Sequence, residues 1–323
     1  MSGAVWAGVS DGPRVVIVLG KGGVGKTTIS IRIAYELAEE GKEVLLASLD
    51  PAKHLLEYLE LDRALAEKRV APRLRAIQYE LETVAKRVAD EYSAILRRIM
   101  PGLTALSLDD VVKAVREAPG FEEEVFLRMV SQLYERGDVD AVVVDTPPTG
   151  IALRVIALPK LHIFWIRKLA EIRSRIVSIR YAIANAMGRP KDARDPVLDK
   201  LRELEARYQG LWEKMRSPST RYAVVATPEP LPLYEAEAVF RRLARDGMRP
   251  SLLVVNKVLG PKAAALGTAE LEQQMIARAR MLACSVRPPA ILALVRYADK
   301  PPSHFSDVAA MDRLIEVQEP SCG

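Results

Sequence analysis

The sequence predicts an α/β fold: a doubly wound, mostly parallel sheet with helices on both faces and an inserted α-helical subdomain. Short, uninterrupted apolar runs recur along the chain, and such runs are typical of strands buried on both faces. Amphipathic stretches with helical spacing alternate with these runs, which is the order of a parallel sheet. A chain of 323 residues with 49% hydrophobic side chains is large enough to bury one extensive core.

The first predicted strand and helix enclose a glycine-rich loop. Residues 14–19 form an apolar run, and residues 27–40 carry apolar side chains at helical spacing. The loop between them matches the phosphate-binding pattern GxxxxGK[ST], and it consists of Gly20, Lys21, Gly22, Gly23, Val24, Gly25, Lys26, Thr27 and Thr28. The backbone N–H groups of such a loop wrap a phosphate, Lys26 reaches the β- and γ-phosphates, and the Thr27 hydroxyl group takes Mg²⁺. The pattern predicts nucleotide binding, and the alternative is a degenerate loop that hydrolyses nothing.

Aspartates end two later strands of the predicted sheet. Residues 42–49 form the second strand, which Asp50 follows, and residues 140–145 form another, which ends at Asp145. Ligands of such sheets bind in the crevice at the carboxyl ends of the strands. An aspartate placed like Asp145 holds Mg²⁺ through water in phosphate-loop proteins. Each aspartate is also a good helix N-cap, so a purely structural role is the alternative.

The remaining pattern divides the chain into a nucleotide-binding domain and a helical insertion. Further strands are expected at 74–81, 221–227 and 251–257, and helices at 83–136 (with breaks at 100–102 and 118–120), 161–187, 197–215 and 231–245. The predicted domain comprises residues 1–84, 137–160 and 220–323, and the insertion comprises 85–136 and 161–219. Asn256 ends the last of these strands, where its amide group could read a purine edge or simply form a turn.

One predicted helix of the insertion carries a long apolar stripe. Its members are Trp165, Leu169, Ile172, Ile176, Ile179 and Ile183. Their spacing places them on one face of a helix. Such a stripe ordinarily packs against another helix, but several amphipathic helices could also line an apolar groove that shields a hydrophobic helix of another protein.

Composition excludes several classes of protein. The net charge is +5 and the sequence pI is about 9.1, but no run of lysine and arginine exceeds two residues, so we expect a solvated basic surface and no nucleic-acid partner. Residues 1–13 lack the pattern of a signal peptide, and no stretch of about 18 uncharged apolar residues is present, so we expect a cytoplasmic protein. Cys284 and Cys322 are far apart, so neither a disulfide framework nor a zinc site within one chain is expected.

Three segments resemble one family. GKGGVGKTT, at 20–28, resembles the deviant phosphate loop shared by nitrogenase iron protein, partition and division-site ATPases, the arsenical-pump ATPase and the tail-anchored-protein targeting ATPase. DTPPTGIALR, at 145–154, resembles switch II of the last two, DTAPTGHTLR, with Ile151 in place of histidine. Asp50, Pro51 and Ala52 resemble their switch I, although Lys53 and His54 stand where histidine and asparagine are usual.

This resemblance implies Mg²⁺-dependent hydrolysis of ATP in a homodimer. Lys26 would hold phosphates, Thr27 and Asp145 would hold Mg²⁺, and Asp50 would orient the attacking water. Lys21 would cross the dimer interface to the partner's nucleotide, and Asn256 would read adenine. The targeting branch further implies binding of hydrophobic C-terminal membrane anchors by the helical insertion, and a membrane receptor.

Departures from the family leave alternatives open. Glu272 and Met275 stand where many targeting ATPases have a CxxC pair that holds zinc between subunits, so zinc is not expected. The alternatives are a metalloid (arsenite) efflux pump motor, a partition or division-site type ATPase switch, and a diverged ATP-binding paralogue. Neither cysteine falls between the switches, which disfavours metalloid activation. Residues 295–302 do not resemble the family's second adenine-flanking loop, and no site residue is predicted there.

Overall fold

The computed structural model describes residues 14–52, 54–60, 64–99, 108–187, 195–318 and 322. A nine-stranded sheet forms the centre, with the strand order β3-β4-β2-β5-β1-β6-β7-β8-β9. The strands are β1 (Val15–Gly20), β2 (Val44–Ser48), β3 (Lys68–Ala71), β4 (Leu74–Gln78), β5 (Ala141–Asp145), β6 (Thr220–Ala226), β7 (Pro250–Val258), β8 (Ile291–Arg296) and β9 (Ile315–Gln318). The seven inner strands are parallel and only the edge strands β3 and β9 run antiparallel to their neighbours, which confirms the predicted sheet.

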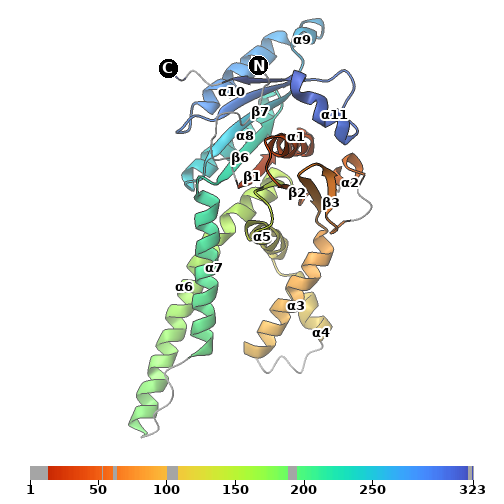
Figure 1. The fold of residues 1–323 in the computed structure, drawn as a ribbon. Coiled ribbons are helices and arrows are strands. Elements are labelled where there is room, and N and C mark those ends of the chain that lie inside the picture. The colour runs from red at the N-terminus through yellow and green to blue at the C-terminus, as the bar shows by residue number, and fades with distance from the viewer. Residues whose placement is uncertain are drawn as a thin grey trace.

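Helices cover both faces of this sheet (Figure 1). They are α1 (Lys26–Glu39), α2 (His54–Tyr58), α3 (Leu81–Ile99), α4 (Leu108–Arg116), α5 (Phe121–Tyr134), α6 (Thr149–Ala186), α7 (Pro196–Arg216), α8 (Pro230–Arg245), α9 (Pro261–Ala265), α10 (Ala269–Ala283) and α11 (Phe305–Ala309). Along β1, Ile17 packs into the core on the side of α5, α8 and α10, whereas Val16 and Val18 pack into the core on the side of α1 and α11. Both faces are thus apolar, which explains the uninterrupted apolar runs.

The edges of the sheet differ most from the predicted elements. The strand expected at 74–81 ends at Gln78, and β3 joins it as an antiparallel hairpin strand that the sequence pattern did not reveal. Edge strands are short and half-exposed, so their apolar signal is weak. At the other edge, the chain continues from α11 through a 3₁₀ turn into β9, a strand that the sequence pattern did not reveal.

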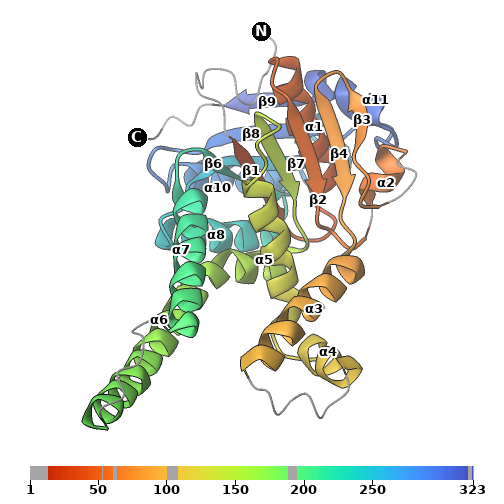
Figure 2. The same cartoon turned by 60° about the horizontal axis from the view of Figure 1, so that its bottom comes forward.

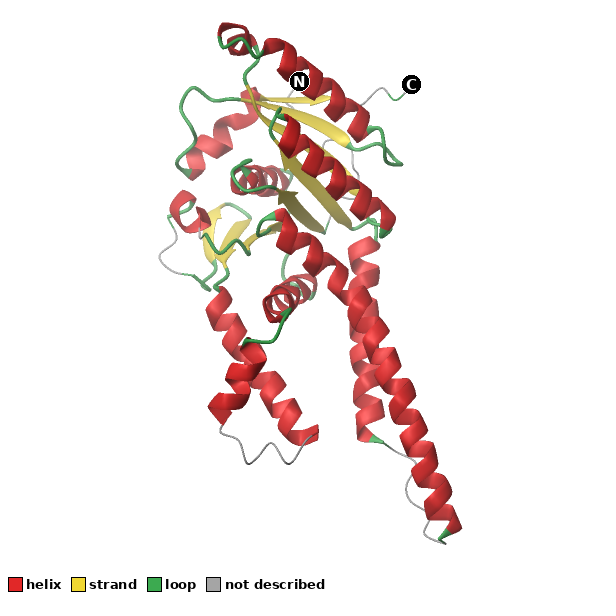
Figure 3. Ribbon diagram, turned by 180° about the vertical axis from the view of Figure 1, so that it is seen from behind, coloured by secondary structure: helices red, strands yellow, loops and turns green. Residues whose placement is uncertain are grey.

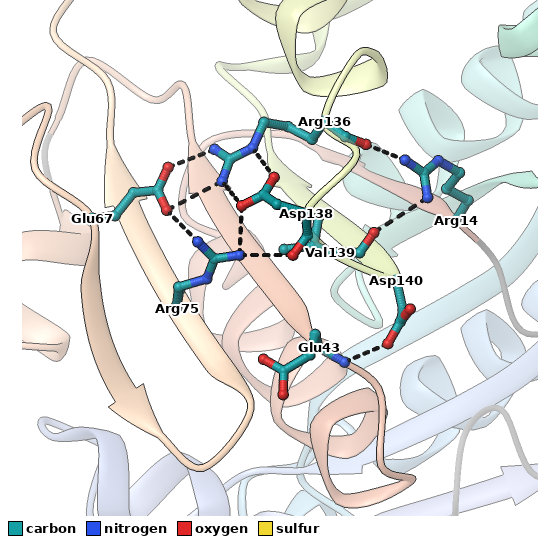
Figure 4. A network of polar contacts seen from close by, with 8 residues as sticks. All are labelled: Arg14, Glu43, Glu67, Arg75, Arg136, Asp138, Val139 and Asp140. Carbon is teal, nitrogen blue, oxygen red and sulfur yellow. Dashed lines mark hydrogen bonds and ion pairs between the residues drawn. The ribbon is translucent and has the colours of Figure 1, made fainter.

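A network of charged side chains ties the β3–β4 hairpin to the amino ends of neighbouring strands (Figure 4). The Arg136 guanidinium group donates to Asp138 at 2.7 Å and to Glu67 at 2.5 Å, and Arg75 donates to the same two carboxylates. The hydrogen bond from Arg136 keeps the pKa of Asp138 well below its usual range. Arg75 and Arg136 therefore each have carboxylates beside them, whereas Arg14 donates to the backbone carbonyl oxygens of Val139 and Arg136.

Two helical projections extend from the same end of the sheet domain, α3 with α4 and α6 with α7 (Figures 1 and 3). The observed helices differ from the predicted domain boundaries. α6 begins at Thr149 and runs through residue 160, and α5, which the prediction assigned to the insertion, supplies Phe126, Leu127 and Met129 to the core beneath the sheet. Figure 2 shows α5 alongside the strands and the two projections leading away from them. A pattern of apolar residues does not reveal whether a helix packs on a sheet or on another helix.

The structure contradicts one expectation about the cysteines. Cys284 follows the last turn of α10, and it forms a disulfide bond with Cys322. Their separation of 38 residues suggested no relation, but β9 returns alongside β8 and brings the two together. No described cysteine is left as a free thiol.

We expect this disulfide to stabilise the folded chain. Cys322→Ser should lower the free energy of unfolding by about 2–4 kcal/mol, because the closed loop restricts the unfolded chain. Denaturant unfolding of the variant and of the reduced parent protein measures this effect. The two should agree, and an unchanged midpoint in both would show that the disulfide does not constrain the unfolded chain.

Candidate functional site

A cavity of about 520 Å³ lies at the carboxyl end of β1, where the strand order reverses. The predicted site residues that line it are Gly22, Gly23, Gly25, Lys26, Thr27, Thr28, Asp50 and Asn256. Gly20, Lys21, Val24 and Asp145 do not line it. The structure therefore brings most of the predicted site together around one cavity.

The phosphate loop depends on close contacts that only glycine permits. Gly25 has φ +93°, and a Cβ atom there would lie 2.4 Å from Nδ2 of Asn256. A Cβ atom on Gly20 would lie 2.6 Å from the carbonyl oxygen of Val225. Gly20 and Val24 thus shape the loop from behind, without facing the cavity.

Asn256 and Lys257 hold this loop from the end of β7. Nδ2 of Asn256 donates to the carbonyl oxygen of Val24 at 2.8 Å, and Oδ1 accepts from the backbone N–H of Lys257 at 2.9 Å. Lys257 has φ +61°, an uncommon conformation for lysine, and its Nζ donates to the carbonyl oxygen of Gly23 at 2.8 Å. Asn256 therefore supports the loop. For the predicted contact with adenine, its side chain has one further N–H on Nδ2 and one further lone pair on Oδ1. Lys257 was not predicted as a site residue.

Asp145 lies buried behind Thr27. Its Oδ2 accepts from the hydroxyl groups of Thr27 at 2.9 Å and Ser48 at 3.1 Å, and its Oδ1 accepts from Ser30 at 3.3 Å. Burial raises the pKa of Asp145 to about 6, because desolvation disfavours the charged form. Hydroxyl and carboxylate oxygens side by side are the ligands that Mg²⁺ prefers, directly or through water, so this pair fits the predicted metal.

Two predicted charged residues, Lys26 and Asp50, line the cavity at the phosphate loop. Lys26 is buried, and its Nζ lies 3.4 Å from the carbonyl oxygen of Lys21. Asp50 lines the cavity and its Oδ1 accepts from the backbone N–H of Ala52 at 3.0 Å, which fixes the side chain at the end of β2. His54 lines the cavity as well, whereas Lys53 lies outside the described residues.

Lys21 faces away from the cavity of its own chain. Its Nζ lies 3.0 Å from Oε1 of Glu235 on α8, and both side chains are partly exposed. An ion pair of this exposure is weak, so a third group could readily displace it.

The far wall of the cavity consists of residues that the sequence analysis missed. Arg296, Tyr297, Ala298, Pro301 and Pro302 follow the carboxyl end of β8. The rule that located Asp50 and Asn256, namely that site residues follow parallel strands, would have found them if β8 had been recognised. Because several of these side chains are apolar or aromatic, this wall is suited to contact a flat ring.

Glu272 and Met275, the positions compared above with a CxxC pair, have structural contacts in this chain. The Glu272 carboxylate accepts from the backbone N–H groups of Leu259 at 2.7 Å and Gly260 at 2.8 Å, and Met275 packs against the core. Within the described ranges, no cluster of three or more histidine, cysteine, aspartate or glutamate side chains has the geometry to hold a metal ion.

Comparisons with known proteins agree with this site. The profile of the anion-transporting ATPase family matches residues 13–279. An Aquifex aeolicus protein named as an arsenical pump-driving ATPase is 30% identical over 251 residues, 76% of this chain and 80% of the relative. A Cryptosporidium parvum protein, an ATPase ASNA1 homolog, is 27% identical over 305 residues, 93% of this chain and 80% of the relative. ATPase GET3B of Arabidopsis thaliana is 26% identical over 261 residues, 75% of this chain and 63% of the relative. The matched region contains the phosphate loop and both aspartates, and the chain belongs to the anion-transporting ATPase family and is an ATPase.

Proposed function

We propose that this ATPase works in the cytoplasm as a homodimer that binds the hydrophobic C-terminal membrane anchors of other proteins and releases them as ATP is hydrolysed. A membrane receptor would accept the released protein. The single observation that carries the proposal is the exposed apolar face of α6, the helix that begins at the nucleotide cavity.

The stripe expected on this helix is not covered by α7. Nine apolar side chains along it are between 41% and 65% exposed, namely Leu161, Phe164, Trp165, Leu169, Ile172, Ile176, Ile179, Ile183 and Met187. α7 carries a similar stripe, Leu201, Leu204, Tyr208, Leu211 and Met215, and the last three of these side chains are buried. This exposure supports the interpretation in which the amphipathic helices of the insertion line an apolar groove, and the groove itself stays a prediction. Such a face on a projecting helix matches the apolar surface of a membrane anchor.

The same helix connects this face to the nucleotide cavity. Pro148, which lines the cavity, is the residue before α6, and α6 continues as one helix to Ala186, with Pro159 inside it. Within the described part of the chain, α6 is also the one helix long and apolar enough by composition to cross a bilayer, with a mean hydropathy of 1.4 over its best window. A shift of the segment after Asp145 would therefore be passed along α6 to the apolar face, through a helix that can bend at Pro159.

In the proposed reaction, each residue of the site has a separate role. The loop amides and Lys26 bind and orient the phosphates, Asp50 orients the attacking water, and Thr27 and Asp145 are placed to hold Mg²⁺, which when bound neutralises phosphate charge. The wall of Tyr297, Pro301 and Pro302 would cover the base.

A metalloid pump motor is the second candidate, because two relatives are named as arsenical pump-driving ATPases. Its activation by arsenite would require free thiols, whereas the two cysteines of this chain form a disulfide bond with each other. This candidate would be supported over ours if arsenite stimulated ATP hydrolysis after reduction of the disulfide and if Cys284→Ser abolished that stimulation.

Co-expression with a tagged membrane anchor, without detergent, tests the proposal. We expect soluble complexes with the parent protein and none with a client that lacks its anchor. Ile172→Ser combined with Ile179→Ser should abolish recovery of the anchor and leave ATP hydrolysis intact, because both side chains are more than half exposed. Leu266→Ser, an exposed leucine outside α6, is the matched control and should recover the anchor normally. Equal recovery by all variants, or no recovery by an active parent protein, would contradict the proposed client.

Mixing two inactive variants tests whether Lys21 acts across a dimer. Lys21→Met and Asp50→Asn should each hydrolyse ATP slowly when alone. In a mixed dimer, the site of the Lys21→Met chain keeps its own Asp50 and receives Lys21 from the partner, so mixing should restore part of the activity. If Lys21 acts within its own chain, no site in the mixture is complete and the activity stays low. Light scattering of the same samples reports the dimer.

A further inference from the structure

A second cavity, of about 390 Å³, lies at the amino ends of β6, β7 and β8, the opposite ends of the strands from the nucleotide cavity. Three arginines line it, of which Arg221 is partly buried, whereas Arg249 and Arg287 are exposed. Arg221 is the second residue of β6, Arg249 immediately precedes β7, and Arg287 lies in the loop that leads to β8. The other lining residues are apolar, serine or glycine, and none of them is acidic.

The three guanidinium groups have no anionic partner in the part of the chain that the structure describes. None of them takes part in an ion pair, and Nε of Arg221 is buried without any hydrogen-bond partner. Burial and the neighbouring charge of Arg249 both lower the pKa of Arg221. The rim at the amino ends of β4 and β5 is different, since Arg75 and Arg136 are neutralised there by Glu67 and Asp138 (Figure 4).

Gathering like charges without counter-charges is unfavourable, and desolvating one of them increases the cost. A bound anion removes this cost, and guanidinium groups match the oxygens of phosphate through paired hydrogen bonds. A phosphate monoester carries nearly two negative charges at pH 7, whereas a single carboxylate would leave most of the positive charge uncompensated. The volume is in the range of small-ligand sites, and Met248 and Val286 offer an apolar wall to the carbon part of such a ligand.

We propose that the cavity between Arg221, Arg249 and Arg287 binds a phosphate monoester, separately from the nucleotide cavity. A free phosphorylated molecule and a lipid headgroup share this chemistry. The site does not depend on the proposed client, and it lies at the opposite ends of the strands from the residues that bind ATP.

Calorimetric titration of the full-length protein with glycerol 3-phosphate tests the proposal, and sedimentation with phosphatidylcholine vesicles that contain phosphatidic acid forms a second arm. Arg221→Gln should weaken binding about tenfold or more, the loss expected for charge-assisted hydrogen bonds. Arg249→Gln should weaken it as well. Arg180→Gln, the same change of charge on α6 away from the cavity, should bind like the parent protein. If glycerol 3-phosphate bound at the phosphate loop instead, all three variants would still bind it, which distinguishes the two sites.

Thermal unfolding in phosphate-free buffer separates binding from a structural role. Because Arg221 is partly buried and has no anionic partner among the described residues, Arg221→Gln should not lower the melting temperature, but glycerol 3-phosphate should no longer raise it. Binding in the first arm alone identifies a free ligand, and binding in the vesicle arm identifies a headgroup. The proposal is overturned if neither probe binds, or if Arg221→Gln and Arg180→Gln bind equally well.

Discussion

Asp145→Asn is expected to abolish ATP hydrolysis and yet to stabilise the nucleotide-free protein at pH 7.5. Hydrolysis should fall roughly a hundredfold or more, because the developing phosphate charge loses the metal that Asp145 is placed to hold. The pKa of this buried carboxyl group is about 6, so at pH 7.5 it is ionised at a cost on the order of 3 kcal/mol compared with its unfolded state. Asparagine removes this charge and keeps an acceptor for the surrounding hydroxyl groups.

The sign of the pH dependence follows from the raised pKa. The folded state binds the Asp145 proton more tightly than the unfolded state, so this group's contribution to stability is complete below about pH 4 and is lost as the pH rises through about 6. The difference in melting temperature between Asp145→Asn and the parent protein, measured from pH 4.5 to 7.5, should therefore grow with pH. A difference that stays constant with pH would show that folding does not raise the pKa of Asp145. Retained hydrolysis would show that Asp145 is not needed for the metal site.

Gly25→Ala is expected to reduce nucleotide affinity by about tenfold or more, the effect of roughly 1.4 kcal/mol. The added Cβ atom would meet Nδ2 of Asn256 at 2.4 Å, and alanine would also be strained at φ +93°. Loss of the hydrogen bond from Asn256 to the Val24 carbonyl group would loosen the loop. Gly22→Ala is the comparison, because its methyl group would meet no atom within 4 Å, and its effect should be smaller. Titration with a fluorescent ATP analogue measures each affinity.

A double-mutant cycle identifies the cause of this loss. Asn256→Ala removes the atom that the new methyl group would strike, so Gly25→Ala should cost less in the Asn256→Ala background than in the parent protein. Equal costs in both backgrounds would assign the whole effect to backbone strain at Gly25. The cycle also shows whether Asn256 acts mainly through the phosphate loop or through the base.

The sequence alone predicted the phosphate loop, Asp50 and Asp145 because their roles depend on local order. A strand, a glycine loop and a helix follow one another within thirty residues, and a parallel strand always delivers its last residue to the same edge of the sheet. The wall formed by Arg296 to Pro302 escaped prediction because β8 was not recognised. The disulfide escaped because two distant cysteines meet only when β9 has paired with β8.

What the sequence determined by itself was therefore the nucleotide site and which residues share each helix face. Only the tertiary structure decided what covers those faces and which charges find partners. The stripes of α6 and α7 have the same spacing, yet the α7 stripe is buried at Tyr208 and Met215 while the α6 stripe is exposed. Lys21 pairs with Glu235, whereas Arg221 has no anion beside it among the residues that the structure describes. Periodicity fixes the direction of a side chain relative to its own backbone, but burial and charge pairing depend on which distant segment arrives beside it.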